Sequence, residues 1–347
     1  VSVDRGVFDP AGSFREPRRL PLEDGSGYRR YVARYLDFFP DGCLAGRRVL
    51  IYEHSSVAAR AMIDVFAGLG ADVVRRGYSE RFVPVDTEAV RPEDVALAQQ
   101  WAAAERFDLL VSADGDGDRP LVGDEQGHWL RGDIAGVLTA RFLDADCVVT
   151  PVSSNTVAER SGWFSRVQRT RIGSPYVIAA MQAQLDSGVE RVVGYEANGG
   201  FLTMLPIEHD GQCLPALPTR DALIVALSVL LLAIRRGLSV SQLPDLLPPR
   251  FTASDRLKEF PSEISQARIA ALIDSPEAVN AQFPDLGIPV EVDTTDGLRM
   301  TFSNDEVVHL RPSGNAPELR CYTEAASAAR ARALNESCLR SLADWRA

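Results

Sequence analysis

The sequence predicts an α/β protein with two consecutive domains built on mixed or parallel sheets, followed by a C-terminal α+β domain with a mostly antiparallel sheet. Short apolar runs alternate with helical segments through the first 240 residues, which is typical of a largely parallel sheet covered on both faces. The same order of elements occurs twice within that stretch, without an alignable sequence repeat. A proline-rich segment from Leu243 to Arg250 then separates it from a different pattern.

These observations give four segments. Residues 1–28 are an irregular lead-in, residues 29–140 and 141–245 are the two α/β domains, and residues 250–347 are the C-terminal domain. In the last segment the pattern predicts one helix before and one helix after a series of short strands, which indicates an antiparallel sheet.

Helices are predicted where apolar residues recur at helical spacing up to a proline or glycine, and strands where short apolar runs lie between turn residues. The first domain contains helices over 28–39, 57–69 and 92–106 and strands over 48–52, 72–74 and 107–113. The second contains strands over 147–150, 167–170 and 191–195 and helices over 155–160, 175–185 and 217–236. The third contains helices over 264–273 and 327–345 and strands over 290–292, 298–302 and 307–310.

Composition narrows the class of function. The net charge of −11 argues against nucleic acid as a partner, although a local positive pocket can still bind a small phosphorylated substrate. Lys258 is the only lysine, so Schiff-base catalysis is disfavoured and a phosphate site must use arginine or backbone amides. Five scattered cysteines without a CxxC pair favour reduced thiols. The apolar run from Ala222 to Ile234 is too short to span a bilayer, so we expect a cytoplasmic protein without a membrane partner; its oligomeric state is open.

Three carboxylates follow the apolar run of residues 107–113 at a spacing of two. Asp114, Asp116 and Asp118 are separated by Gly115 and Gly117, which allow the backbone to turn tightly enough for the side chains to face one point. Hard oxygen ligands on one loop suit Mg²⁺ or Ca²⁺, and a cation would relieve their mutual repulsion. A solvated acidic turn is the alternative interpretation.

A calcium-binding EF-hand partly fits the same stretch. Asp114, Asp118 and Glu125 would occupy its positions one, five and twelve, but Arg119 stands where the loop needs glycine and a strand precedes it where an EF-hand needs a helix. A nucleophilic aspartate of the phosphatase type has no supporting residues nearby. Arg119 instead favours phosphoryl chemistry, because a permanent guanidinium beside a metal can hold anionic oxygen near the cation.

Two further loops carry groups suited to sugar and phosphate. Glu196 and Asn198 lie on a glycine-flanked turn after a strand, where they could bind vicinal hydroxyls. Arg311, Ser313 and the backbone near Gly314 and Asn315 could form a phosphate site. Each loop taken alone can also be an ordinary turn.

Together and in this order, the three loops resemble those of the α-D-phosphohexomutase superfamily, the phosphomannomutases and phosphoglucomutases. The metal loop of that family corresponds to 114–119, its sugar loop to 196–199 and its phosphate loop to 311–317. Asn198 replaces a serine and Asn315 a threonine, and both substitutes can still hydrogen-bond. The resemblance covers about residues 28–340.

The resemblance implies an isomerase in which a phosphoserine exchanges phosphate with the 1- and 6-positions of a hexose phosphate, mannose phosphate being favoured, through a bound bisphosphate. It implies a catalytic role for Arg119 beside the transferring group and Mg²⁺ as cofactor, with a hexose 1,6-bisphosphate as activator. The implied metal ligands are Asp114, Asp116 and Asp118, the sugar-binding residues Glu196 and Asn198, and the phosphate-binding residues Arg311, Ser313, Gly314 and Asn315.

The serine loop of the family is not found in this sequence, and its first domain is interpreted as missing, with residues 1–28 as a remnant. His54 and His309 are candidates for the general base by residue type only. The alternative function is therefore a non-catalytic relative that binds sugar phosphate and metal, or an inactive fragment.

Overall fold

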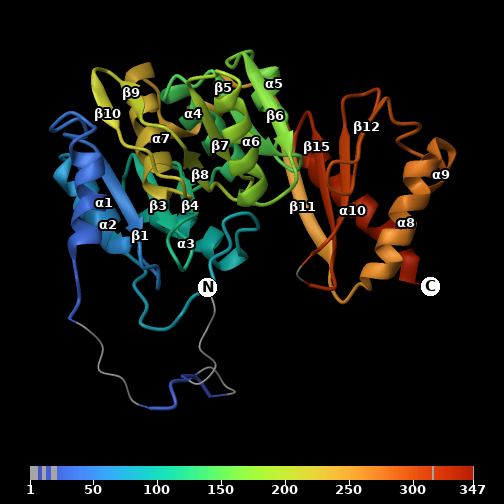
Figure 1. The fold of residues 1–347 in the computed structure, drawn as a ribbon, viewed down its shortest axis with the longest axis horizontal. Helices are drawn as coiled ribbons and strands as arrows, with labels where there is room; N and C mark the ends of the chain where they lie inside the picture. The colour runs from blue at the N-terminus through green and yellow to red at the C-terminus, as the bar shows by residue number, and fades with distance from the viewer. Residues whose placement is uncertain (1–6, 10–12, 17–21, 315, 347) are drawn as a thin grey trace.

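The computed structural model describes residues 7–9, 13–16, 22–314 and 316–346. Two α/β units lie side by side, and a third unit adjoins them through the strand β11 (Phe251–Leu257) (Figure 1). Around residues 7–16 an isolated bridge joins Phe8 to Phe14, and the first helix, α1, spans Ser26–Leu36.

The first two sheets have the same topology. The first has the order β2-β1-β3-β4 and the second the order β6-β5-β7-β8; in each, three strands are parallel and the last is antiparallel. The strands of the first are β1 (Arg48–Tyr52), β2 (Asp72–Arg76), β3 (Leu109–Ala113) and β4 (Pro120–Gly123). Those of the second are β5 (Cys147–Pro151), β6 (Arg166–Thr170), β7 (Val192–Tyr195) and β8 (Phe201–Thr203). The repeat of element order predicted from the sequence is therefore present in the fold.

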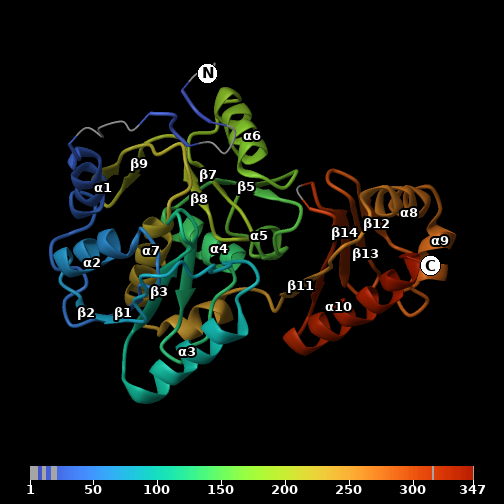
Figure 2. The same ribbon diagram turned by 90° about the horizontal axis from the view of Figure 1, so that it is seen from below.

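The helices of this part pack on both faces of the two sheets (Figure 2). They are α2 (Ala59–Gly68), α3 (Pro92–Ala104), α4 (Gly132–Phe142), α5 (Val157–Arg160), α6 (Ser174–Asp186) and α7 (Ala222–Arg236). A hairpin of β9 (Ile207–His209) and β10 (Gln212–Leu214) precedes α7. Both α4 and α7 contact strands of the two sheets, so they form a layer shared by the two units.

Alternating side chains of β1 explain how the layers are held together. Val49 and Ile51 pack into a large core that also contains α4, α7 and residues of the second sheet, whereas Leu50 and Tyr52 pack against α3 on the opposite face. This is the two-residue period expected of a strand buried on both sides. The first two units thus share one continuous apolar core, from Tyr35 to Leu247.

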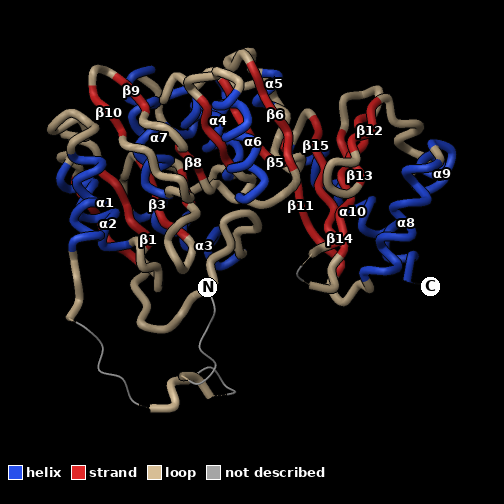
Figure 3. Tube along the Cα trace, in the orientation of Figure 1, coloured by secondary structure: helices blue, strands red, loops and turns tan. Residues whose placement is uncertain are grey.

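The C-terminal unit has its own core. Its antiparallel sheet has the order β11-β15-β14-β13-β12, with β12 (Glu291–Asp293), β13 (Leu298–Thr301), β14 (Val307–Pro312) and β15 (Leu319–Ala325). The helices are α8 (Ser262–Asp274), α9 (Pro276–Gln282) and α10 (Ala328–Ala343), followed by a short 3-10 turn, η2 (Asp344–Arg346) (Figure 3). Residues from Phe260 to Trp345 form this second core, separate from the first.

The fold class predicted from the sequence is confirmed, and several elements differ in detail. The proline-rich segment is not irregular throughout, because it contains the 3-10 helix η1 (Val240–Leu246), whose Leu243 is fully buried. The strands β4, β8, β9, β10, β11 and β15 and the helices α4 and α9 were not predicted. Nearly all of α4 is buried, so it lacks the amphipathic pattern by which a helix is recognised in a sequence.

No single helix among the described residues has the length and apolar composition needed to cross a membrane. The pair α7 and η1 passes that test only when taken together, although the chain bends by 80° between them. Most of α7 is buried in the shared core.

Candidate functional site

The acidic loop and the glycine-flanked loop occupy equivalent positions in the two repeated sheets. The first connects β3 to β4 and the second connects β7 to β8, in each case between a parallel strand and its antiparallel neighbour. Their backbones also close alike: the amide of Asp114 donates to the Arg119 carbonyl, and the amide of Glu196 to the Gly200 carbonyl. The fold thus places Asp114 and Glu196 at corresponding points of two copies of one motif.

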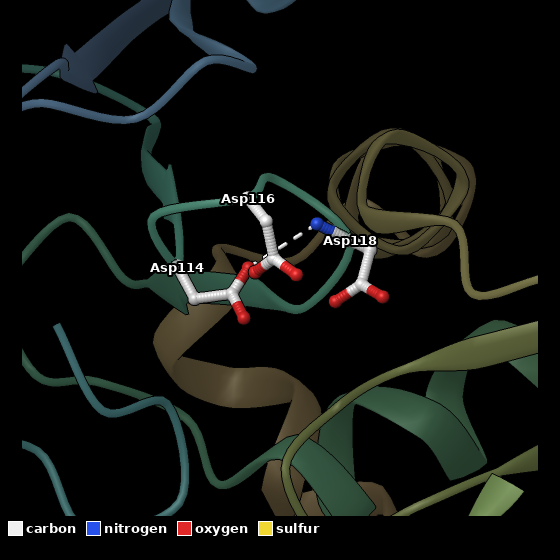
Figure 4. A group of neighbouring side chains, drawn as sticks. All are labelled: Asp114, Asp116 and Asp118. Carbon is white, nitrogen blue, oxygen red and sulfur yellow. Dashed lines mark hydrogen bonds between the residues drawn. The ribbon is translucent and has the colours of Figure 1, made fainter. Parts of the chain in front are cut away.

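The three aspartates project from the loop into one region (Figure 4). Each offers one carboxylate oxygen, and these oxygens lie within 4.8 Å of one another. Asp114 Oδ1 accepts from the backbone amides of Gly117, Asp118 and Arg119 at 3.1, 3.2 and 3.1 Å, which fixes the turn. Gly117 has a φ of +80°, a conformation that strongly favours glycine.

The charges in this loop fit a divalent cation. Oδ2 of Asp114 and Oδ1 of Asp118 are buried and form no hydrogen bond of good geometry within the described ranges; the charged group that faces both is the guanidinium of Arg119. Burial raises the pKa of Asp114, the amide and guanidinium of Arg119 oppose that rise, and the neighbouring Asp116 adds to it. Such a cluster of hard, partly unsatisfied oxygens has the donor chemistry that Mg²⁺ prefers.

Arg119 lies beside these carboxylates. Its Nε is 2.8 Å from Asp114 Oδ2 and 3.6 Å from Asp118 Oδ1. It also lines a cavity of about 200 Å³ between the first and third units, together with Arg256, Arg320 and Tyr322. The carboxylates of Asp86, Glu88 and Asp255 line the same cavity, so the three guanidinium groups can bind a phosphate locally but do not make the cavity positive as a whole.

The EF-hand interpretation is wrong. The element before the loop is the strand β3, and Glu125, the expected twelfth ligand, accepts instead from the backbone amide and hydroxyl of Ser241 at 3.1 and 2.5 Å.

The second loop is mostly buried, and Arg220 joins it to the acidic loop by contacting both Glu196 and Asp118. Asn198 Oδ1 accepts from the Gly200 amide at 2.9 Å, and its carbonyl accepts from the Thr87 hydroxyl at 2.7 Å, so both a side-chain and a main-chain oxygen are engaged within the protein. Burial raises the pKa of Glu196, and the guanidinium groups of Arg220 and Arg119 partly offset that effect.

The helix α4 approaches this loop through glycines. A Cβ on Gly132 would lie 2.1 Å from the Gly199 nitrogen, and a Cβ on Gly136 would lie 2.6 Å from Cγ of Tyr195. The close contacts of α4 with the second loop and with Tyr195 of β7 therefore require glycine at both positions. This requirement also explains why a residue with low helix propensity occurs twice in a buried helix.

The third loop, between β14 and β15, is one strand away from the cavity. Arg311 pairs in the ladder with Arg320, which lines that cavity. Ser313 is buried and its amide donates to the Glu318 carbonyl at 2.8 Å, whereas Gly314 is exposed. Asn315 lies outside the described residues. The structure therefore does not place the third loop directly against the acidic loop.

Sequence reasoning missed two residues that organise these loops. Arg220, before α7, contacts Asp118 and Glu196. Asp296 accepts from Arg311 Nε at 2.9 Å and from the backbone amide of Ile172 at 2.9 Å, so it connects the third loop to the second unit. Neither residue belongs to a recognisable motif, and their partners are distant in sequence, so no local pattern could have identified them.

The two histidines considered as bases have structural contacts. His54 Nε2 lies 2.7 Å from the Ala113 carbonyl and His309 Nε2 lies 2.6 Å from the Asp296 carbonyl. Burial lowers the pKa of both, to about 4 for His309. These contacts match ordinary buried histidines held by a carbonyl.

Comparison with known proteins identifies the class. A family model described as "Phosphoglucomutase/phosphomannomutase, alpha/beta/alpha domain III" matches residues 131–251, and the C-terminal domain of the same family matches residues 264–340. The chain is 43% identical over 326 residues to a phosphomannomutase of Salmonella muenchen, covering 93% of this chain and 68% of that protein. It is 42% identical over 295 residues to a phosphomannomutase of Sinorhizobium fredii, covering 85% and 62% of the two chains.

Solved structures agree at the level of the fold. A phosphoglucomutase/phosphomannomutase family protein from Burkholderia thailandensis superposes with a TM-score of 0.68 at 18% identity, covering 92% of this chain and 64% of that one. An Aspergillus fumigatus N-acetylphosphoglucosamine mutase, solved with GlcNAc-6P and magnesium, gives a TM-score of 0.61 at 16% identity, covering 92% and 65%.

The chain belongs to the phosphoglucomutase/phosphomannomutase family of enzymes. It spans about two thirds of the length of the curated relatives it matches, 68% and 62% for the first two. The domain limits at 28, 140 and 245 stay predictions; the match that begins at residue 131 includes α4 with the second unit.

Proposed function

We propose that this chain carries the metal, sugar and phosphate sites of a phosphohexomutase that moves phosphate between the 1- and 6-positions of a hexose phosphate, with mannose phosphate as the favoured substrate. The observation that carries this proposal is the pairing of an acidic loop with a Glu-containing loop at equivalent turns of two repeated sheets, connected by one arginine. The identity of 43% to a phosphomannomutase supports mannose phosphate over other hexose phosphates.

In this proposal the acidic loop holds Mg²⁺ through Asp114, Asp116 and Asp118. When bound, the cation supplies electrostatic stabilisation of phosphoryl oxygen during transfer. Arg119 orients the transferring phosphate from the cavity that it lines, because its guanidinium is within reach of both the carboxylates and the open space.

The other two loops bind the substrate. The carboxylate of Glu196 accepts hydrogen bonds from sugar hydroxyls, and Asn198, whose Oδ1 is held by the Gly200 amide, donates to them through its side-chain NH₂ group. Arg311, Ser313, Gly314 and Asn315 anchor the phosphate that does not react. Asp296 holds only Nε of Arg311, so the guanidinium can still form further hydrogen bonds through its Nη groups.

A bound hexose 1,6-bisphosphate and a phosphoserine complete the proposed cycle. No serine of the chain is assigned that role, because the sequence contains no phosphoserine-loop motif. A cytoplasmic location fits five cysteines that are all free thiols.

The test is a coupled mutase assay with mannose 1-phosphate, Mg²⁺ and a hexose 1,6-bisphosphate, run beside calorimetric binding of mannose 1-phosphate. Turnover that disappears in Asp116→Asn would support the proposal. Absence of turnover with binding that is lost in Arg311→Ala would instead favour a non-catalytic sugar-phosphate-binding role. Absence of both would refute the proposed function and leave the family assignment as a statement about ancestry and fold.

A further inference from the structure

Arg220 is fixed between the acidic loop and the sugar loop. Its Nε donates to Asp118 Oδ2 at 2.8 Å, and its Nη1 lies 3.5 Å from Glu196 Oε2. Its aliphatic stem fills the space beside Gly200, where a Cβ would come within 2.5 Å of the Arg220 Cδ. The side chain is about one quarter exposed, 26%.

The position of Arg220 is set by a rigid neighbour. Asp221, the next residue, caps α7 by accepting from the Ile224 amide, and it is fully enclosed by contacts with Tyr35 and Arg34. The backbone at Arg220 is therefore anchored to the shared core. A guanidinium on such a support can hold a carboxylate in one orientation at little further entropic cost.

The contact with Arg220 gives the two carboxylate oxygens of Asp118 different surroundings. Oδ2 is taken by Arg220, whereas Oδ1 is buried and has no hydrogen-bond partner within the described part of the chain. Only Oδ1 therefore remains for a cation. Asp114 is restricted in the same way, because its Oδ1 already accepts from three loop amides; its Oδ2 lies 2.8 Å from Arg119 Nε, so a cation bound there shares this oxygen with the guanidinium.

Single-oxygen ligation matters for the choice of metal. Mg²⁺ takes six ligands at short distance and commonly binds carboxylates through one oxygen, whereas Ca²⁺ takes six to eight and gains from carboxylates that bind through both. Two dications of equal charge feel the same repulsion from a nearby guanidinium. The ratio of their affinities therefore reports ligand geometry and is insensitive to the loss of a positive charge.

We infer that Arg220 is a positioning residue that keeps Asp118 a one-oxygen ligand and so selects Mg²⁺ over Ca²⁺, while it connects this ligand to the sugar-binding carboxylate Glu196. The inference rests on the proposed metal and sugar sites. It assigns to Arg220 a role in metal selectivity that acts through Asp118 and not through contact with the metal.

The test measures Mg²⁺ and Ca²⁺ binding by calorimetry on the full chain. Arg220→Met keeps the stem that packs on Gly200 and removes every donor, so Ca²⁺ affinity should rise relative to Mg²⁺ affinity by about tenfold. Arg220→Lys can still hold one oxygen of Asp118, so its ratio of Ca²⁺ affinity to Mg²⁺ affinity should equal that of the wild type. Arg191→Met removes an exposed guanidinium that pairs with Asp146 at 2.7 Å and is the control for lost charge.

A second measurement tests the contact between Arg220 and Glu196 separately from the metal selectivity. Arg220→Lys cannot span both carboxylates, so the dissociation constant of mannose 1-phosphate, measured by calorimetry, should rise several-fold while the ratio of Ca²⁺ to Mg²⁺ affinity is unchanged. A metal-affinity ratio for Arg220→Met within twofold of wild type would refute the inference and leave the proposed function intact. A wild-type chain that binds neither cation would refute the proposed metal site itself.

Discussion

Replacement of His309 by glutamine should weaken the acid sensitivity of the C-terminal unit. His309 is 2% exposed on β14, its ring stacks on Tyr322 at 5.3 Å, and its Nε2 contacts the Asp296 carbonyl. Burial lowers its pKa from the ordinary 6.5 to about 4; the nearby Arg299 and Arg311 also lower it, whereas the contact with Asp296 raises it. The buried ring is therefore neutral in the folded protein at pH 7.

The sign of the effect follows from proton binding. Between pH 6.5 and about 4 the unfolded chain binds a proton at His309 that the folded chain does not, so the free energy of unfolding falls as the pH falls through that window. The change from 6.5 to about 4 corresponds to about 3 kcal/mol, of which about 2 kcal/mol is lost between pH 7.5 and pH 5. Other titrating groups contribute equally to the wild type and to the variant.

Urea unfolding at pH 7.5 and pH 5 measures this difference. Trp345 lies in the C-terminal core and the other three tryptophans lie in the first two units, so replacing those three by phenylalanine in every variant makes the fluorescence report the relevant transition. His309→Gln can still donate to the Asp296 carbonyl, and its stability should fall by about 2 kcal/mol less than that of the wild type. His128→Gln, at an exposed position, should behave as the wild type does. If the free energy of unfolding fell equally in His309→Gln and wild type between pH 7.5 and pH 5, the conclusion that His309 is buried and neutral in the folded protein would be refuted.

Two further predictions concern close contacts in the interior of the protein. Glu324→Gln should destabilise the protein by about 3–5 kcal/mol in urea unfolding, because it leaves the buried Arg250, whose Nε lies 2.5 Å from Glu324 Oε1, without its charge partner. Gly132→Ala should lower stability by about 1–3 kcal/mol and weaken calorimetric binding of mannose 1-phosphate, because the new Cβ would clash with the sugar loop at Gly199.

Matched variants control these two experiments. Asp305→Asn removes the exposed pair with Arg160 and should cost less than about 1 kcal/mol. Gly27→Ala adds a methyl group in α1 where no atom lies within 4 Å, and it should stabilise by about 0.5–1 kcal/mol. If Glu324→Gln cost no more than Asp305→Asn, the buried pair would not stabilise the protein as predicted. If Gly132→Ala bound mannose 1-phosphate like Gly27→Ala, α4 would not support the sugar loop.

The two α/β units show how much the local pattern could establish. The strand β1 was predicted with its observed limits, Arg48–Tyr52, because a short apolar run between polar residues leaves few other conformations. By contrast, β15 contains the charged residues Arg320 and Glu324, because the face that carries them is directed toward the other units. Its strand character depends on partners more than a few residues away, so periodicity alone did not reveal it.

The sequence alone determined the fold class and the clustering of three carboxylates on one loop. Both depend on short-range features: apolar runs at strand or helical spacing, and three carboxylates separated by glycines on one turn. Only the tertiary structure decided which distant groups meet this loop. Arg220 reaches Asp118 across 102 residues and Asp296 reaches Ile172 across 124, and such contacts are set by the packing of whole sheets. The local sequence pattern determines the backbone conformation of a residue. The orientation of a carboxylate oxygen, by contrast, depends on tertiary contacts with residues distant in the sequence.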